Sequence, residues 1–312
     1  MNNLILAFNV VLPLFLCIAL GYFLRRIGMM EEAPRRAMNK LCFKVFLPFY
    51  LFHSICTTDL GEAFDLKLIL IAALGIVGLF ALAMLIVPRI EKEPPRRGVM
   101  IQGIFRSNYA LFGLPVALSL CGESKMGPTS LLLGVIVPIF NVLAVITLET
   151  FRGGKPDLKK MLKGILTNPL IISSLGGVLV NLSGVQLPSA VLKGISDVGR
   201  VATPLSLVVL GSEFMFSNVR GYLKQLLITV TGRLVFCPLI MVVIAAALGL
   251  RNEMLIPVMI LFGAPTAVSS FTMAQQMDGD SDLAASIVVF TSAFAILSIF
   301  LWIFILKQLA LI

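Results

Sequence analysis

The chain has 312 residues, of which 58% are hydrophobic and 13% are charged, whereas soluble domains carry about 25% charged residues. This composition excludes a soluble globular domain, because so much apolar surface needs a lipid bilayer as its solvent. The net charge of +9 does not indicate nucleic-acid binding, because the basic residues lie between apolar runs, which is typical of membrane topology.

Ten apolar runs are long enough, at about 20 residues each, to cross a bilayer as helices. In chain order they are residues 4–24, 40–58, 67–88, 98–121, 127–150, 164–182, 190–214, 222–249, 254–277 and 283–306. The seventh run is the weakest candidate, because Lys193, Asp197 and Arg200 fall inside it. The sequence therefore predicts an all-α integral membrane protein of ten transmembrane helices.

The loops between these runs differ in charge. Those after the first, third and fifth runs carry most of the loop lysines and arginines, and cytoplasmic loops are rich in these residues. We therefore expect a multi-pass protein of the inner (cytoplasmic) membrane with both termini outside. The longest basic loop, 151–164, is then a cytoplasmic linker.

An internal repeat emerges when the sequence is compared with itself at a shift of 156 positions. The residues that meet are Pro13 and Pro169, Gly21 and Gly177, Lys44 and Arg200, and Pro48 and Pro204. Because each half holds five spans, an odd number, the halves 1–150 and 165–312 must have opposite orientations, as in the inverted repeats of secondary transporters. Chance matching of glycine and proline in apolar sequence is the alternative.

Helix breakers lie inside the fourth and ninth runs. Pro115 and Pro265 each lack an N–H and leave a carbonyl four residues earlier unpaired, which is tolerated at membrane depth only beside protein or a cavity. Unwinding at both prolines brings two half-helix N-termini together, and such ends attract anions. Ordinary proline kinks are the alternative. Neutral hydrogen-bonding groups near the breaks belong to Asn108, Tyr109, Thr266, Ser269 and Ser270.

Two arginines lie deep in apolar runs, where a charge needs a reason. Arg106 is able either to hold a substrate carboxylate or to extend towards the headgroups, and Arg233 has a similar depth in the eighth run. No carboxylate lies in the two broken segments, which argues against tight coupling to a proton or sodium, although Glu149 and Glu213 at helix ends remain candidates.

The remaining charges of the apolar runs have a structural or gating role. Asp197 is spaced from Lys193 and Arg200 so that the three neutralise one another on one helix face. Lys44 and Arg200 lie four residues before the paired prolines and mark the two water boundaries.

Enzyme chemistry has little support. The chain has one histidine, His53, and no GxSxG, HExxH or Walker A pattern. The five cysteines include no CxxC pair, which argues against disulfides and metal. We expect no catalytic activity, no metal and no cofactor beyond a possible coupling proton or sodium ion.

The chain resembles the auxin efflux carrier family, which includes plant PIN-FORMED auxin exporters and bacterial malate and malonate permeases. The motifs that carry the resemblance are Arg106-Ser107-Asn108, Gly113-Leu114-Pro115, Asn168-Pro169-Leu170, Ala264-Pro265-Thr266-Ala267-Val268 and Asp282-Leu283-Ala284-Ala285-Ser286. The resemblance implies a 5+5 inverted repeat in which broken helices 4 and 9 cross, a fold like those of sodium/proton antiporters and bile-acid symporters. It also implies a homodimer.

The resemblance further implies an anion bound at the crossing, with Asn108 on its carboxylate. Where bacterial relatives usually show Thr-Gly after this asparagine, the chain has Tyr109-Ala110, and where they show Asn after Ala-Val it has Ser269. The predicted substrate-binding residues are Arg106, Asn108, Tyr109, Pro115, Asn141, Pro265, Thr266 and Ser269.

The sequence thus predicts a secondary active or potential-driven transporter of small organic anions, mono- or dicarboxylates, that works by alternating access. The alternative is a membrane sensor or receptor that binds a carboxylate in the same pocket without transporting it. We expect the partners to be a small carboxylate substrate and the lipid bilayer, and no nucleic acid.

Overall fold

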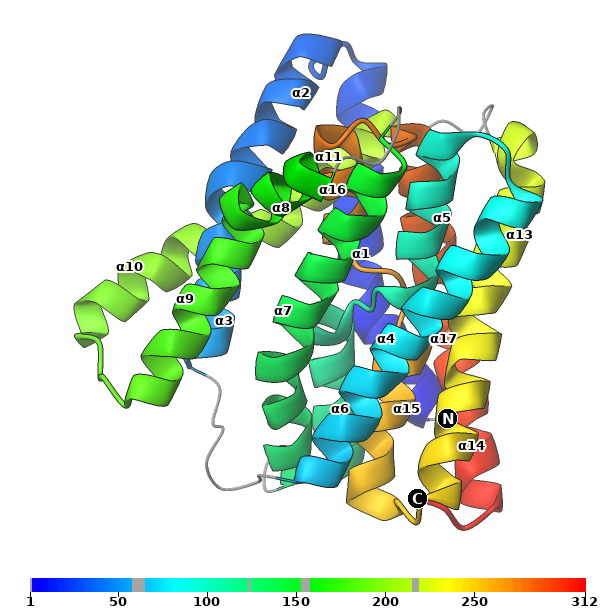
Figure 1. Ribbon diagram of the computed structural model, residues 1–312. Helices are drawn as coiled ribbons and strands as arrows, with labels where there is room; N and C mark the ends of the chain where they lie inside the picture. The colour runs from blue at the N-terminus through cyan, green and yellow to red at the C-terminus, as the bar shows by residue number, and fades with distance from the viewer. Residues whose placement is uncertain (1, 58–64, 123–124, 153–157, 215–218) are drawn as a thin grey trace.

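The computed structural model describes residues 2–57, 65–122, 125–152, 158–214 and 219–312, and its regular elements in these ranges are all helices (Figure 1). The first half holds α1 Asn2–Arg26, α2 Glu32–Leu41, η1 Cys42–Phe46, α3 Leu47–Cys56, α4 Leu66–Ile90, α5 Pro94–Phe105, η2 Tyr109–Gly113, α6 Leu114–Cys121 and α7 Gly127–Thr150. The second half holds α8 Leu158–Thr167, α9 Pro169–Ser183, α10 Ser189–Arg200, α11 Ala202–Glu213, η4 Arg220–Tyr222, α13 Leu223–Thr231, η5 Gly232–Phe236, α14 Cys237–Ala247, η6 Asn252–Met254, α15 Leu255–Gly263, α16 Val268–Gln276 and α17 Ser281–Gln308.

Several helices suit a bilayer. Among the described residues, four continuous helical segments are long and apolar enough to cross a membrane, namely Leu66–Ile90, Gly127–Thr150, Arg220–Ala247 and Ser281–Gln308. Large apolar side chains are exposed on the outer faces of α4, α9, α14 and α17. A surface of this kind is stable when lipid covers it, so the fold is that of an all-helical membrane protein.

Both chain ends lie at one end of the molecule, the lower end in Figure 1. The opposite end, where α2 and α5 begin, carries the basic residues Arg35, Arg96 and Arg152, and we call it the basic face. Of the predicted linker 151–164, residues 153–157 lie outside the described residues, and residues 158–164 belong to α8.

Three helices widen into a π-turn that ends two residues before a proline. The turns are Cys42–Phe46 before Pro48, Tyr109–Gly113 before Pro115 and Gly232–Phe236 before Pro238. A proline cannot donate an N–H and displaces the carbonyl four residues earlier, and the wider turn makes room for it. The carbonyl freed by Pro238 belongs to Leu234 and accepts bonds from Ser298 (2.8 Å) and Trp302 (3.1 Å).

The fourth predicted span unwinds at residues 106–108 and not at Pro115, where the sequence placed the break. Pro115 is exposed at the start of α6, directly after the π-turn of η2, and this wider turn accommodates the proline within a continuous helical segment. The ninth span unwinds at residues 264–267, around Pro265 as expected.

The two breaks cross and pair with each other through their backbones. Asn108 donates its N–H to the Pro265 carbonyl at 2.8 Å, and Ala267 donates to the Arg106 carbonyl at 3.3 Å. These bonds form an isolated antiparallel bridge between Ser107 and Thr266. Backbone groups that two unwound helices would leave unpaired inside a membrane are thereby satisfied.

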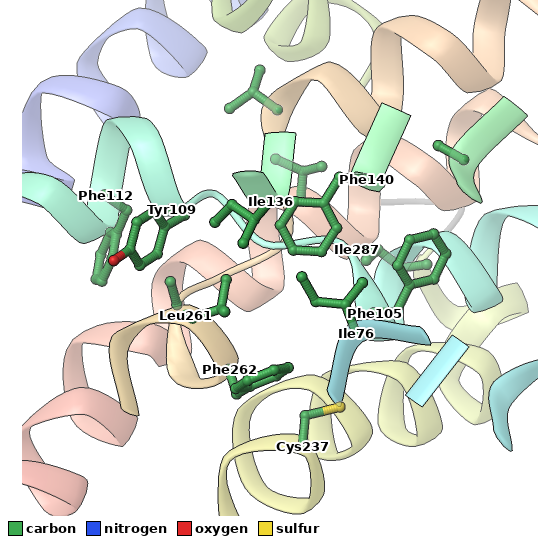
Figure 2. Packing of buried hydrophobic residues seen from close by; sticks show 14 of the residues in the cluster. Ile76, Phe105, Tyr109, Phe112, Ile136, Phe140, Cys237, Leu261, Phe262 and Ile287 are labelled. Atoms are coloured by element: carbon green, nitrogen blue, oxygen red, sulfur yellow. The ribbon is translucent and has the colours of Figure 1, made fainter. Parts of the chain in front are cut away.

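Apolar side chains from α4, α5, α7, α15 and α17 surround the crossing (Figure 2). Phe105, the last residue of α5, packs edge-on against Phe80 of α4, with ring centroids 5.5 Å apart, and lies 6.2 Å from Phe140 of α7. This packing holds the crossing in place, and Phe140 also lines the cavity described below.

Close helix contacts at glycines join the two halves. A Cβ on Gly21 of α1 would lie 1.9 Å from the Val208 carbonyl oxygen of α11, and one on Gly177 of α9 would lie 3.0 Å from the Phe52 carbonyl oxygen of α3. Gly21 and Gly177 meet at the shift of 156, and so do Phe52 and Val208. At this shift, the contact of α1 in the first half with α11 in the second corresponds to the contact of α9 in the second half with α3 in the first.

Candidate substrate site at the helix crossing

A cavity of about 60 Å³ lies beside the crossing, room for roughly four water molecules. Its walls come from α3, the first break with the turn that follows it, α7, α11 and the start of α16. Among the predicted residues, those that line it are Arg106, Asn108, Tyr109, Asn141 and Ser269. No aspartate or glutamate is among its lining residues.

Arg106 brings a buried positive charge to this cavity. Its side chain is 4% exposed, Nη2 donates to Asn141 Oδ1 at 2.8 Å, and Nη1 lies 2.6 Å from Met273 Sδ. Asn141 is held in turn, because its Nδ2 donates to Ser174 Oγ of α9 at 3.0 Å. Within the described ranges no carboxylate pairs with Arg106, so neutral groups orient the guanidinium and an anion in the cavity would neutralise it.

Unused hydrogen-bonding groups surround the same crossing. Asn108 Nδ2, Ser107 Oγ and Ser270 Oγ are buried and have no hydrogen-bond partner among the described residues. A buried donor without a partner costs about 1–3 kcal/mol and calls for an explanation, and a bound ligand or water supplies one. Of these three residues, Ser107 and Asn108 line the cavity.

Two helical segments begin at the cavity. One runs from Tyr109 through η2 into α6, and the other is α16, which starts at Val268, and neither start has a side-chain cap. The first N–H groups of a helix have no partner within it, and its N-terminus carries about half a positive charge. Together with Arg106, both ends make the cavity attractive to an anion.

Arg233 lies on the other side of the crossing and is fully buried. Its guanidinium donates to the carbonyls at the C-terminal ends of both first half-helices, namely Ile104 (3.2 Å), Phe105 (3.2 Å), Leu261 (2.6 Å) and Ala264 (2.7 Å). Helix C-termini carry partial negative charge, which a cation offsets. Arg233 thus caps α5 and α15 and does not reach the cavity.

Three of the predicted substrate-binding residues, Pro115, Pro265 and Thr266, do not line the cavity. Thr266 donates its hydroxyl to the Gly103 carbonyl at 2.8 Å, and Pro265 accepts the N–H of Asn108. Pro115 is exposed on α6, outside the site. Tyr109 does line the cavity, but its hydroxyl is already bound to the Thr129 carbonyl at 3.1 Å.

The charges assigned to a gating or structural role lie away from the cavity. Lys193 pairs with Asp197 at 2.7 Å on the exposed face of α10, as their spacing predicts. Arg200 forms no ion pair with Asp197 in the described part of the chain, but it interacts electrostatically with this carboxylate. Lys44 and Arg200 are both exposed.

Comparison with known proteins decides the family. The sequence model of a family described as "Membrane transport protein" matches residues 6–160 and 155–303. The chain belongs to this family, the auxin efflux carriers. An uncharacterized transporter of Methanocaldococcus jannaschii is 22% identical over 305 residues, covering 94% of this chain and 97% of the relative. The uncharacterized transporter YfdV of Escherichia coli K12 is 26% identical over 301 residues, covering 89% and 92%.

The family and these relatives are transporters and not enzymes, which agrees with the absence of catalytic motifs from the sequence. For this auxin efflux carrier family member, the predicted substrate-binding residues leave out four polar residues that line the cavity, Tyr50, Ser107, Thr203 and Ser206. A signal for each existed, since Ser107 lies in the Arg106-Ser107-Asn108 motif, Tyr50 and Ser206 each follow one of the prolines that meet at the shift of 156, and Thr203 precedes one. Proline positions alone do not say which face of the helix meets the cavity.

Proposed function

We propose that this membrane transport protein carries small organic anions, mono- or dicarboxylates, by alternating access, with the substrate carboxylate bound at the crossing. The observation that supports this most is Arg106, a buried cation that faces a cavity without an acidic partner among the described residues. In this proposal the substrate carboxylate accepts hydrogen bonds from the guanidinium of Arg106, from the Nδ2 of Asn108 and from the N–H groups at the start of α16.

The proposal includes a 5+5 inverted repeat of ten spans, with halves 1–150 and 165–312. The equivalent contacts of Gly21 and Gly177 and the pairing of the two breaks support it. Two such halves related by a pseudo-two-fold axis exchange roles when the site opens to the other side. We also propose that the protein is a homodimer in the inner membrane with both termini outside.

The energetics of transport follow from the charge of the substrate. A membrane potential that is negative inside favours anion export by about 2.3 kcal/mol per charge per 100 mV, so export needs no coupling ion, whereas import needs a proton or sodium ion. Because no carboxylate lines the cavity, we favour transport driven by the potential, with Glu149 and Glu213 as the candidate sites if an ion is coupled.

Binding to Asn108 is tested by thermal unfolding of the purified protein with malate, malonate, succinate, lactate and indole-acetate. We expect one or more carboxylates to raise the unfolding temperature, because a ligand that binds only the folded state stabilises it. The corresponding amides should not do so, since they lack the charge. The variant Asn108→Ala should stay folded and lose the effect, and Asn181→Ala, an asparagine of α9 that does not line the cavity, should keep it. Equal stabilisation of wild type and Asn108→Ala would place the site elsewhere.

A further inference from the structure

A polar seam connects the cavity to the basic face. It is formed by α2, α11 and α16, which pack against one another. On each helix the successive polar side chains are three, four or seven residues apart, which places them on one face of the helix. They are Arg35, Asn39 and Cys42 on α2 and η1, Ser206 and Glu213 on α11, and Ser269, Thr272 and Gln275 on α16.

The seam starts at the cavity, since Ser206 and Ser269 line it. Two contacts continue the seam from there. Cys42 Sγ lies 2.8 Å from Ser206 Oγ, and Asn39 Nδ2 donates to the Thr272 carbonyl at 3.4 Å. Seven residues separate Arg35 from Cys42 and Ser206 from Glu213, which corresponds to about 10 Å of helix in each case. Only a thin layer of protein therefore separates the cavity from the basic face.

The middle of the seam is buried, and several of its polar side-chain atoms lack hydrogen-bond partners among the described residues. Asn39 and Thr272 are fully buried, and Asn39 Oδ1 and Thr272 Oγ1 have no hydrogen-bond partner among the described residues. Gln275 Oε1 is unpaired in the same way. Each such group costs free energy while the helices are closed and regains partners when water enters. A structural interface has no use for these groups, whereas a passage that is hydrated when open does.

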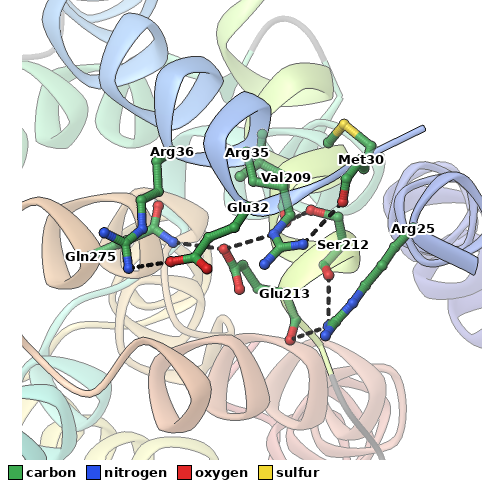
Figure 3. A network of polar contacts seen from close by, with 9 residues as sticks. All are labelled: Arg25, Met30, Glu32, Arg35, Arg36, Val209, Ser212, Glu213 and Gln275. Carbon is green, nitrogen blue, oxygen red and sulfur yellow. Dashed lines mark hydrogen bonds and ion pairs between the residues drawn. The ribbon is translucent and has the colours of Figure 1, made fainter. Parts of the chain in front are cut away.

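A cluster of three side chains closes the seam at the basic face (Figure 3). Glu213 Oε1 accepts bonds from Arg35 Nε at 3.1 Å and from Gln275 Nε2 at 3.0 Å, so a single carboxylate links α2, α11 and α16. Arg35 and Glu213 are 12% and 13% exposed, so this pair is screened much less than a surface pair. The backbone of Glu213 is held as well, by Arg25 on its carbonyl.

We propose that this seam is the substrate route between the crossing and the basic face, and that the Arg35–Glu213–Gln275 cluster is its gate. The inference rests on the proposed transport of an anion through the crossing. In the closed gate Glu213 supplies the carboxylate that Arg35 binds, and a substrate carboxylate entering or leaving replaces it on the same guanidinium. Arg35 is thus a second, transient anion site of the transporter.

Cys42 gives a readout that needs no substrate, because it is buried in the seam between the gate and the cavity. Membrane vesicles of each orientation are treated with the anionic, impermeant reagent sulfonatoethyl methanethiosulfonate, and peptide mapping measures the rate of modification of Cys42. In wild type we expect slow modification. In Glu213→Gln and in Arg35→Gln we expect modification from the basic face to be about tenfold faster, as a loss of about 1.4 kcal/mol from the closed state gives.

The matched control is Arg36→Gln, which breaks the exposed pair of Arg36 with Glu32 on the same helix and should leave the rate unchanged. The exchange of Arg35→Glu with Glu213→Arg restores the ion pair and should slow the reaction again. If the charge variants do not fold, Gln275→Ala removes the link to α16 alone and should also speed the reaction. Rates no faster than in Arg36→Gln, or faster only from the opposite face, would overturn the gate. If the rates of Cys42 modification change as expected but the protein transports no carboxylate, the result would instead overturn the proposed function.

Discussion

At the scale of single residues, the two buried arginines of the crossing have opposite roles although the sequence presents them alike. Arg233 satisfies carbonyls at two helix ends, whereas Arg106 is oriented by an amide and a thioether and keeps its charge available to the cavity. Depth in an apolar run identified both as unusual. It could not separate them, because the partners of Arg233 lie about 30 and 130 positions away in the sequence.

The same substitution at both positions tests this division. We expect Arg233→Gln to lower the stability by on the order of 3–5 kcal/mol, because buried carbonyls lose their partner. Arg106→Gln should leave the unfolding temperature unchanged or raise it, because it removes a buried charge that has no counter-ion. Thermal unfolding of both purified variants without ligand measures the difference. Equal losses would show that Arg106 is a structural residue like Arg233.

At the scale of elements, the sequence predicted which helices break better than where they break. Pro265 does mark the second break, but the first lies at residues 106–108, before a π-turn that absorbs Pro115. The position of the first break is set by pairing between Ser107 and Thr266, a tertiary contact that local propensity does not encode. The prediction that Asn108 lies at the crossing did not depend on the position of Pro115, because it rested on the Arg106-Ser107-Asn108 motif.

The contact of α1 with α11 supports the arrangement of the helices and can be tested by itself. A Cβ on Gly211 would lie 2.0 Å from the Ile18 carbonyl oxygen, so Gly211→Ala should force the helices apart and cost about 1–3 kcal/mol. Gly194→Ala on α10 is the control, because a Cβ there meets nothing within 4 Å and alanine favours a helix. Thermal unfolding compares the two variants, and equal stability would contradict the close α1–α11 contact.

At the scale of the whole molecule, composition and apolar runs were sufficient to predict an all-helical membrane protein, and the motifs were sufficient for its family. The shift of 156 aligns Gly21 with Gly177, and these two glycines make equivalent close contacts with α11 and α3. The polar seam was not visible, because α2, α11 and α16 come from distant parts of the chain and each contributes only a few polar positions. Which faces of helices meet is a property of the packed molecule.

The measurement that tests the central claim most directly is solid-supported-membrane electrophysiology on proteoliposomes, with the carboxylates named above and their amides, with and without sodium and pH gradients. The account predicts a current for one or more carboxylates in wild type and in Arg36→Gln, and none in Arg106→Gln, although that variant stays folded. A current that survives in Arg106→Gln, or one that an amide produces as strongly as its acid, would contradict an anion carrier with its site at the helix crossing.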